Sequence, residues 1–174
     1  MSQTFIGIDC GISGAIAIIT PDRAIQLHDC PIAPKTGKFN RHDSLRMHEL
    51  LLPCAGTNAI AIVESVHFDW RDEAKKGSAE VLVRSHEAWL TLLQILGIPC
   101  QNLYPVQWRK LAGCDAGWDK AAIVRYACKL YPAVRSQLKR RSSRATAGYM
   151  LETGKAEALL MAHAAQSLQG EAIA

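Results

Sequence analysis

The sequence predicts an α/β fold, and three observations lead to this prediction. Two short runs rich in β-branched residues flank a glycine-rich turn in Thr4–Ile19 (TFIGIDCGISGAIAII), which is typical of two strands joined by a tight turn. A second apolar run, Ala59–Val63 (AIAIV), is continuous and of strand length, as in a buried strand. Later in the chain, apolar residues recur at helical spacing, most clearly in Asp119–Tyr131.

The composition is that of one compact domain, which we expect to span residues 1–174. Of the 174 residues, 49% are hydrophobic, which is enough for a single core. No apolar stretch is long enough to cross a bilayer, and the first residues lack the basic segment of a signal peptide. The six cysteines form no CxxC pair, so we expect reduced thiols in a cytoplasmic protein rather than disulfides or a zinc site.

The elements after the opening hairpin follow from apolar runs, caps and helix breakers. Polar, irregular segments separate them at 31–40 and 66–77. The expected elements are a third strand at Ala24–Cys30, a helix at Ser44–Leu52 capped by Asp43, the strand Ala59–Val63, a long helix at Ala79–Leu96 between Ser78 and Gly97, a strand at Pro99–Tyr104, a short turn or helix opened by Pro105, and the helix Asp119–Tyr131.

The last part of the chain contains two segments of different character. Ala133–Ala147 is basic and short of large apolar residues, so we expect it to be mobile or to become ordered only on binding. The last helix covers roughly Lys155–Leu168 and is started by Gly154 or the residues just before it. It is apolar almost all round, and we expect it to pack against the sheet with Glu157 in its first turn.

The charged residues are unevenly distributed. Residues 101–150 hold ten Lys and Arg but only two acids, whereas the first hundred residues hold nine basic and eleven acidic residues. This asymmetry favours a basic face that binds a polyanion, although a solvated surface without a partner explains the charge equally well.

Three acids, Asp9, Glu64 and Glu157, share one property: each is a solitary carboxylate at or near the end of an apolar element. If the fold brings them together, their mutual repulsion favours a bound divalent cation, and an all-oxygen ligand set suits Mg²⁺ or Mn²⁺. Each acid also has an ordinary structural explanation. Asp9 can accept hydrogen bonds from the amides of its turn, Glu157 can complement a helix N-terminus, and Glu64 can pair with Arg71.

A resemblance to a known family rests on four segments that occur in the family's order: Ile6–Ile18 (IGIDCGISGAIAI), Ala61–Val66 (AIVESV), the LGIP and YPVQWRK block in Leu96–Lys110, and Gly154–Ala164 (GKAEALLMAHA). The match extends to Ala116–Val124 (AGWDKAAIV) and so covers most of the chain. In these segments the chain resembles the RuvC-type Holliday junction resolvases of the ribonuclease H-like superfamily, most closely their phage and prophage branch.

The resemblance implies a ribonuclease H-like fold, with a five-stranded mixed sheet whose first three strands are antiparallel and which helices flank. It implies that Asp9, Glu64 and Glu157 are the catalytic, metal-binding acids. The family usually carries a fourth acid or a histidine three or four residues before the last acid, where this chain has Gly154 and Thr153. The nearest acid, Glu152, points away from Glu157 if it lies inside the helix but can reach the metal if the helix starts near Gly154. A second metal site is therefore left open.

The resemblance also implies a set of contacts to branched DNA. The family places an aromatic wedge in the loop after Glu64, where the candidates in this chain are His67, Phe68 and Trp70. Cationic side chains are expected to contact phosphates without reading sequence. They are Lys120, one of Arg109 and Lys110, and further Arg71, Lys75, Lys76, Lys139, Arg140 and Arg141. The helix Ala79–Leu96 is the expected dimer surface.

The function implied is that of a magnesium-dependent endonuclease. It would act as a homodimer on four-way or other branched DNA, make paired symmetric nicks and leave 5′-phosphate and 3′-hydroxyl ends. The expected setting is the cytoplasm of a bacterial host, with the protein phage- or prophage-encoded, and neither a membrane nor a nucleotide cofactor is expected. Two alternatives remain open: a RuvC-like module that binds branched nucleic acid without cutting it, and a YqgF-type RNA-processing nuclease. An actin-type ATPase is excluded because it needs two such domains, which 174 residues do not provide.

Overall fold

The computed structural model describes residues 3–34, 41–66, 76–141 and 149–168. Its centre is a five-stranded sheet in the order β3-β2-β1-β4-β5. Strands β1 (Thr4–Asp9), β2 (Ala15–Ile19) and β3 (Ile25–Asp29) form an antiparallel meander, while β4 (Ala59–Glu64) lies parallel to β1 and β5 (Cys100–Leu103) parallel to β4. This arrangement confirms the predicted mixed sheet with three antiparallel strands at its start.

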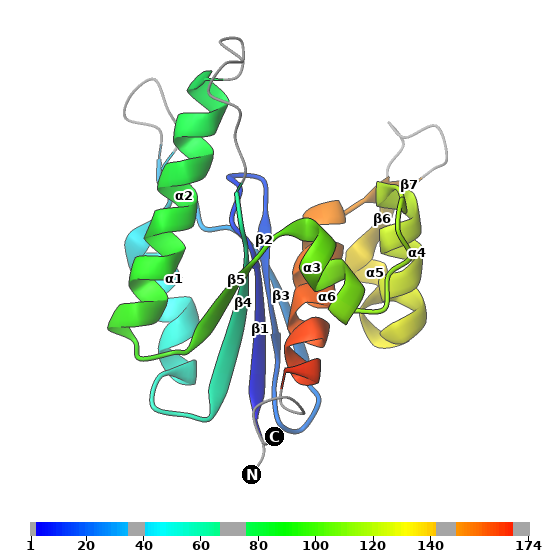
Figure 1. Cartoon of the computed structure of the whole chain (residues 1–174), viewed down its shortest axis with the longest axis horizontal. Helices are drawn as coiled ribbons and strands as arrows, with labels where there is room; N and C mark the ends of the chain where they lie inside the picture. Colours follow the sequence, from blue (N-terminus) through cyan, green and yellow to red (C-terminus); the bar gives the residue numbers. More distant parts are fainter. Residues whose placement is uncertain (1–2, 35–40, 67–75, 142–148, 169–174) are drawn as a thin grey trace.

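Helices cover both faces of the sheet, as Figure 1 shows. On one face lie α1 (Ser44–Leu51), the short 3₁₀ helix η1 (Leu52–Cys54) and α2 (Lys76–Ile95). The other face carries α3 (Pro105–Leu111), α4 (Lys120–Leu130), η3 (Pro132–Val134), α5 (Arg135–Leu138) and α6 (Thr153–Ser167). A separate two-stranded antiparallel sheet is formed by β6 (Lys139–Arg141) and β7 (Tyr149–Leu151).

The two faces of the sheet support two cores because side chains alternate along each strand. In β2, Ile16 and Ile18 belong to the core under α1 and α2, whereas Ala15, Ala17 and Ile19 belong to the core under α6. Small residues on the α6 side let this helix approach closely. A Cβ added to Gly7 of β1 would lie 2.0 Å from the carbonyl oxygen of Ala158, so the backbone of α6 rests directly on β1.

The helix ends agree in part with the sequence expectations. Asp43 accepts a hydrogen bond from the Arg46 amide (3.2 Å) and caps α1 as predicted. Asp119, predicted as the first residue of its helix, is instead the N-cap of α4 and accepts a hydrogen bond from the Ala122 amide (2.7 Å). Helix α2 begins at Lys76, earlier than the predicted start after Ser78.

All six cysteines are free. No helix within the described ranges has the length and apolar character needed to span a membrane.

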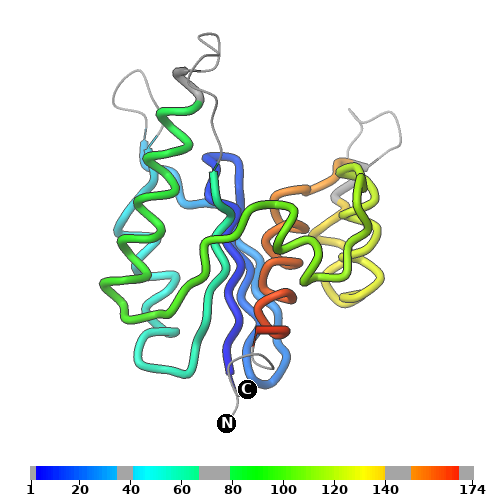
Figure 2. Tube along the Cα trace, in the orientation of Figure 1, coloured from blue at the N-terminus to red at the C-terminus, as the bar shows by residue number. Residues whose placement is uncertain are grey.

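The expectation that Ala133–Ala147 is mobile is wrong for residues 133–141. This segment forms η3, α5 and β6, and it is fixed by Val134, 5% exposed, and Leu138, fully buried, which both join the core under α6. Two well-placed apolar side chains therefore anchor a segment whose average composition is polar. Residues 142–148 lie outside the described residues. Figure 2 shows how β7 then leads directly into α6, beside the central sheet.

Candidate active site

The ends of two neighbouring parallel strands place two of the predicted acids side by side. Asp9 is the last residue of β1 and Glu64 the last residue of β4, and the register pairs Ile8 with Val63 directly before them. Since Ile8 and Val63 face the core under α2, alternation directs Asp9 and Glu64 to the opposite face, where α3 and α6 lie. Helix α6 brings Glu157 over this same face.

The pKa values show that the three acids share one electrostatic environment. Burial raises the pKa of Asp9 from 3.8 to about 6; the amide of Gly11 lowers it, and the charge of Glu157 raises it. Burial likewise raises the pKa of Glu64 from 4.5 to about 7, with further increases from the charges of Asp9 and Glu157. Removal from water and like-charge repulsion therefore act together on these carboxylates.

Helix α3 supplies a partner for two of the three acids. The indole N–H of Trp108, a fully buried side chain, donates to Oε2 of Glu64 at 3.1 Å. The next residue, Arg109, forms an ion pair with Glu157, with 2.9 Å between Nη2 and Oε1. The Arg109 guanidinium also lies 5.3 Å from the centre of the Trp108 ring. The site is thus built from acids of β1, β4 and α6 and donors of α3.

The predicted structural explanations of the acids can now be compared with their contacts. Asp9 does accept a hydrogen bond from the Gly11 amide, at 3.4 Å. Glu64 accepts from Trp108, and its suggested partner Arg71 lies outside the described residues. The prediction that Glu157 lies in the first turn of its helix is wrong, because α6 begins at Thr153 and Glu157 is its fifth residue. Its cationic partner is Arg109 rather than a helix N-terminus.

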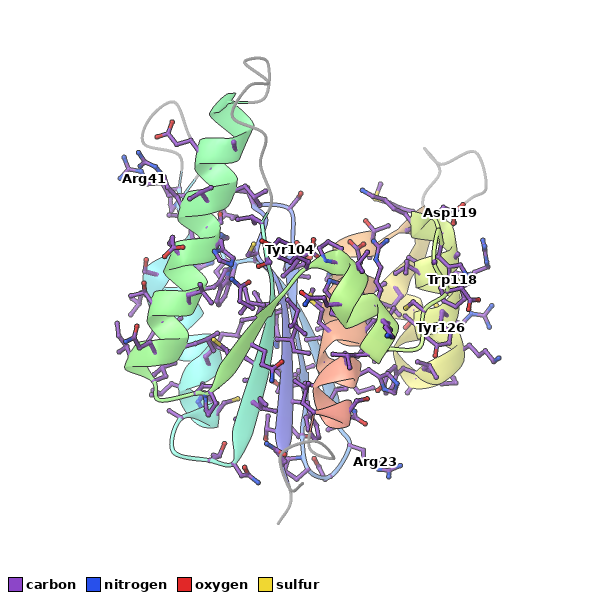
Figure 3. All side chains as sticks on the ribbon, viewed as in Figure 1. Arg23, Arg41, Tyr104, Trp118, Asp119 and Tyr126 are labelled. Atoms are coloured by element: carbon purple, nitrogen blue, oxygen red, sulfur yellow. The ribbon has the colours of Figure 1, made fainter. Side chains whose placement is uncertain are left out.

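A second cation, Lys120, approaches the site from α4. Its charge lowers the pKa of Asp9. Lys120 is the first residue of α4, directly after the cap Asp119, and Trp118 packs edge to face on Tyr126 with ring centroids 5.0 Å apart (Figure 3). This contact fixes the segment that carries Lys120. Of the two candidate cations in α3, Arg109 is the one ion-paired to an acid, and Lys110 is exposed.

The other predicted DNA contacts are less completely described. Lys139 is half-buried at the start of β6. The backbones of Arg140 and Arg141 belong to β6 and that of Lys76 to α2, but the structure does not describe these three side chains. A further five candidates lie outside the described residues altogether: His67, Phe68, Trp70, Arg71 and Lys75.

Glu152 and Gly154 mark the start of α6. Glu152 is half-buried at the N-cap, so it lies before the helix and not inside it; its amide donates to the carbonyl of Leu138 at 3.0 Å. A Cβ at Gly154 would lie 3.2 Å from both Oδ2 of Asp9 and the carbonyl oxygen of Ser13. A side chain at position 154 would therefore contact Asp9, and a glycine there lets the start of α6 lie close to the turn between β1 and β2.

Sequence reasoning missed two features of this site. It identified Gly154 only as a missing acid, and it gave Trp108 no role. A partner 44 residues from Glu64 leaves no periodic signal in the sequence; the one available hint was an aromatic donor directly before the cationic pair of the WRK motif.

The donor chemistry of the site fits a hard divalent cation. Three carboxylates that lie within electrostatic reach of each other, two with raised pKa values, are the ligand type that Mg²⁺ and Mn²⁺ prefer. Among the described residues, however, no three His, Cys, Asp or Glu side chains are gathered closely enough to hold an ion as they stand. In this conformation Glu64 and Glu157 are bonded to Trp108 and Arg109 instead.

Comparisons with known proteins locate the fold. Neither a protein-family profile nor a curated protein matches the sequence. Among solved structures, the chain is similar to Thermus thermophilus RuvC in complex with a Holliday junction substrate, with a TM-score of 0.57 and 14% identity over 97% of this chain and 96% of that chain. A second Thermus thermophilus RuvC structure matches with a TM-score of 0.54 and the same identity and coverage. The chain therefore has the α/β fold of RuvC, a five-stranded mixed sheet flanked by helices.

Proposed function

We propose that this protein is a metal-dependent endonuclease that resolves four-way or otherwise branched DNA junctions. The observation that carries the proposal is that Asp9, Glu64 and Glu157 lie within electrostatic reach of one another at one end of a RuvC-like sheet, with Arg109 and Lys120 beside them. Isolated buried carboxylates destabilise a fold, so a cluster of this kind favours a functional role.

Each residue of the cluster has a distinct part in this reaction. Asp9, Glu64 and Glu157 would hold Mg²⁺, or Mn²⁺ in its place, and Glu152 at the N-cap of α6 is a further candidate ligand. When bound, such a cation neutralises charge on a phosphate and lowers the pKa of a water molecule. Trp108 holds one oxygen of Glu64, and Lys120 and Arg109 supply positive charge for a phosphodiester backbone.

Branched DNA is the proposed substrate for two reasons. One of the similar structures contains RuvC in complex with a Holliday junction substrate. In this chain, residues 101–150 carry ten basic and two acidic residues, and they form the layer that contains α3, α4 and β6. In a bacterial cell or its phage, a two-fold dimer of such a protein would nick the two equivalent strands of a junction in pairs.

Helix α2 is the proposed dimer surface. It lines an open groove with α1 that has a volume of about 510 Å³ and includes Met47, Val83, Leu92 and Ile95. Ile95 is 73% exposed and leaves apolar surface at the edge of this groove. Docking of a second copy along α2 would cover it.

Cleavage of a synthetic four-way junction tests the proposal. With Mg²⁺ we expect paired, symmetric nicks that end in 5′-phosphate, and no nicks from Asp9→Asn, which keeps the size of the side chain but removes its charge. A linear duplex and a fork of the same sequence serve as substrate controls. Equal cutting of all three DNAs would indicate a general branch nuclease, and preferred cutting of structured RNA would indicate an RNA-processing enzyme.

Tight junction binding without nicks in any divalent metal would favour a non-cleaving module. The observation in favour of that second candidate is Gly154, which occupies the position in contact with Asp9 without offering a ligand.

A further inference from the structure

The ion pair between Arg109 and Glu157 joins two distant parts of the chain at the proposed metal site. Arg109 comes from α3, 48 residues before Glu157 in sequence, and its Nη2 lies 2.9 Å from Oε1 of that acid. Its side chain is 33% exposed and that of Glu157 16%, so the ion pair is half-buried and open to solvent on one side. In this conformation an oxygen of a proposed metal ligand is bound to a protein cation.

The ion pair is also incompletely satisfied. The Nε of Arg109 is buried, and it has no hydrogen-bond partner among the residues that the structure describes. A guanidinium in a purely structural ion pair normally uses its donors on planar, bidentate acceptors, and an unused buried N–H costs free energy. The site therefore holds Arg109 by one acid contact and by the face of Trp108, 5.3 Å away.

The cluster as a whole needs more positive charge than Arg109 supplies. The charges of Asp9 and Glu157 both act on Glu64, and Arg109 and the indole of Trp108 only partly offset them. A divalent cation among the three acids would neutralise them better than one guanidinium does, and the two cations would compete for the oxygen of Glu157.

We propose that Arg109 is the exchangeable counter-ion of the metal-free site: it competes with the divalent cation for Glu157, and when displaced it turns its guanidinium to the DNA backbone. This inference rests on the proposed nuclease function. Trp108 keeps its bond to Glu64 throughout and acts as a positioning residue, so one turn of α3 contains both a fixed and an exchangeable donor.

Linkage gives the proposal a second consequence. If the cation frees Arg109 for a phosphate, bound metal increases the affinity of the protein for DNA. Bound DNA must then increase its affinity for the metal by the same factor. Replacing Arg109 by an uncharged side chain removes both effects, so metal alone binds more tightly while the coupling between metal and DNA decreases.

Calorimetric titration with Mn²⁺ in the absence of DNA tests the first consequence. Arg109→Met keeps the length and apolar stem of the side chain and removes the competing charge. We expect its Mn²⁺ affinity to be about five- to tenfold higher than that of the wild type, as for removal of a half-buried ion pair. Lys110→Met removes the same charge from the adjacent, exposed position and should leave the affinity within about twofold. Asp9→Asn should remove the binding and so identify the site.

The second consequence is tested by junction binding with and without Ca²⁺, chosen as a metal that supports little or no cleavage. The gain in junction affinity on adding Ca²⁺ should be at least about threefold smaller in Arg109→Met than in the wild type. Arg109→Lys keeps the charge, and its gain in junction affinity on adding Ca²⁺ should lie between those of the wild type and Arg109→Met. Thermal melts verify that each variant is folded.

The possible outcomes separate this inference from the proposed function. If Arg109→Met binds Mn²⁺ no more tightly than the wild type, while the wild type still cleaves the junction, the exchange is wrong and the nuclease assignment stands. If neither protein binds Mn²⁺ and no junction is cut, the proposed function fails and the exchange fails with it.

Discussion

Asp9 has an unfavourable environment in the folded protein. Its carboxylate is largely buried, its hydrogen bond from the Gly11 amide is long at 3.4 Å, and the charge of Glu157 is close enough to raise its pKa. Asp9 thus lowers the stability of the metal-free fold, as is common for groups whose role is to bind or react.

Replacing Asp9 by Asn should stabilise the metal-free protein at pH 8. The pKa of Asp9 is about 6 in the folded protein and near 3.8 in the unfolded chain, so the folded state holds its proton more tightly. The free energy of unfolding of the wild type therefore falls as the pH rises from about 4 to 6, and Asn does not titrate. Urea unfolding in the presence of EDTA should show Asp9→Asn more stable by about 1–3 kcal/mol at pH 8 and nearly equal at pH 4. Equal stability at both pH values would contradict the buried-carboxylate interpretation.

Gly154 offers a second prediction at the residue scale. A Cβ there lies 3.2 Å from Asp9 Oδ2, so Gly154→Asp adds a fourth carboxylate beside the first one. Gly154→Ala introduces the same crowding without charge and is the matched control. We expect Mn²⁺ to raise the melting temperature of Gly154→Asp by more than that of Gly154→Ala or the wild type. The reverse order would mean that position 154 does not face the cation.

The three acids could be singled out from the sequence because each is isolated in an apolar element, and the fold brings them within electrostatic reach of one another. That they bind a metal stays a prediction. Their partners could not be predicted. The contacts of Trp108 with Glu64 and of Arg109 with Glu157 span 44 and 48 residues, and only the packing of α3 beside α6 brings them into range.

At the scale of elements, α3 holds the site together. It follows β5 through Tyr104, whose amide is capped by Gln107 at 2.9 Å, and it packs beside α6 and β4 (Figure 3). Its position thus couples the end of β4, where Glu64 lies, to the helix that carries Glu157.

Trp108→Phe should remove the hydrogen bond that α3 donates to Glu64. Phenylalanine fills most of the buried volume but lacks the N–H that bonds Glu64 at 3.1 Å. Because this bond lowers the pKa of Glu64, its loss should move the acidic limb of the pH–rate profile to higher pH. We expect junction cleavage to slow by about 10- to 100-fold with junction affinity unchanged. An unshifted pH profile would indicate that the indole only fills space.

Most elements could be predicted because strands and helices have strong local signals. The strands around Gly11 and the cap Asp43 are examples. The segment 133–141 was not predictable, since the burial of Val134 and Leu138 and the pairing of β6 with β7 fix it, and these partners lie in distant elements. The start of α6 at Thr153 agrees with the prediction that Gly154 or the residues just before it begin the last helix.

At the scale of the whole molecule, the two helical layers differ in chemistry. The layer with α3, α4 and β6 contains the basic part of the sequence, whereas the layer with α1 and α2 contains the apolar groove. Figure 1 shows these layers on opposite sides of the sheet, so the proposed DNA contact and the proposed dimer contact would use separate layers.

Ile95→Glu should reduce self-association without unfolding the protomer, because Ile95 is 73% exposed. Sedimentation at micromolar concentration should show a shift toward monomer, and nicks in a junction should become single rather than paired. Leu52 is 50% exposed and lies outside the groove lining, so Leu52→Glu is the control. Its sedimentation and its nicking pattern should match those of the wild type. A wild-type protein that is monomeric at all concentrations would contradict the role given to α2.

The different supports of the three acids have a mechanical consequence. Asp9 and Glu64 are the last residues of adjacent strands, and the hydrogen bonds between these strands fix the separation of the two residues. Glu157 is carried by α6, which packs on β1 through van der Waals contact rather than through a hydrogen-bonded ladder. The distance of Glu157 from Asp9 and Glu64 therefore depends on how α6 packs. If the proposed metal site is correct, substitutions under α6 that shift Glu157 relative to Asp9 and Glu64 would alter the ionic radius that the site accepts, while the sheet itself stays unchanged.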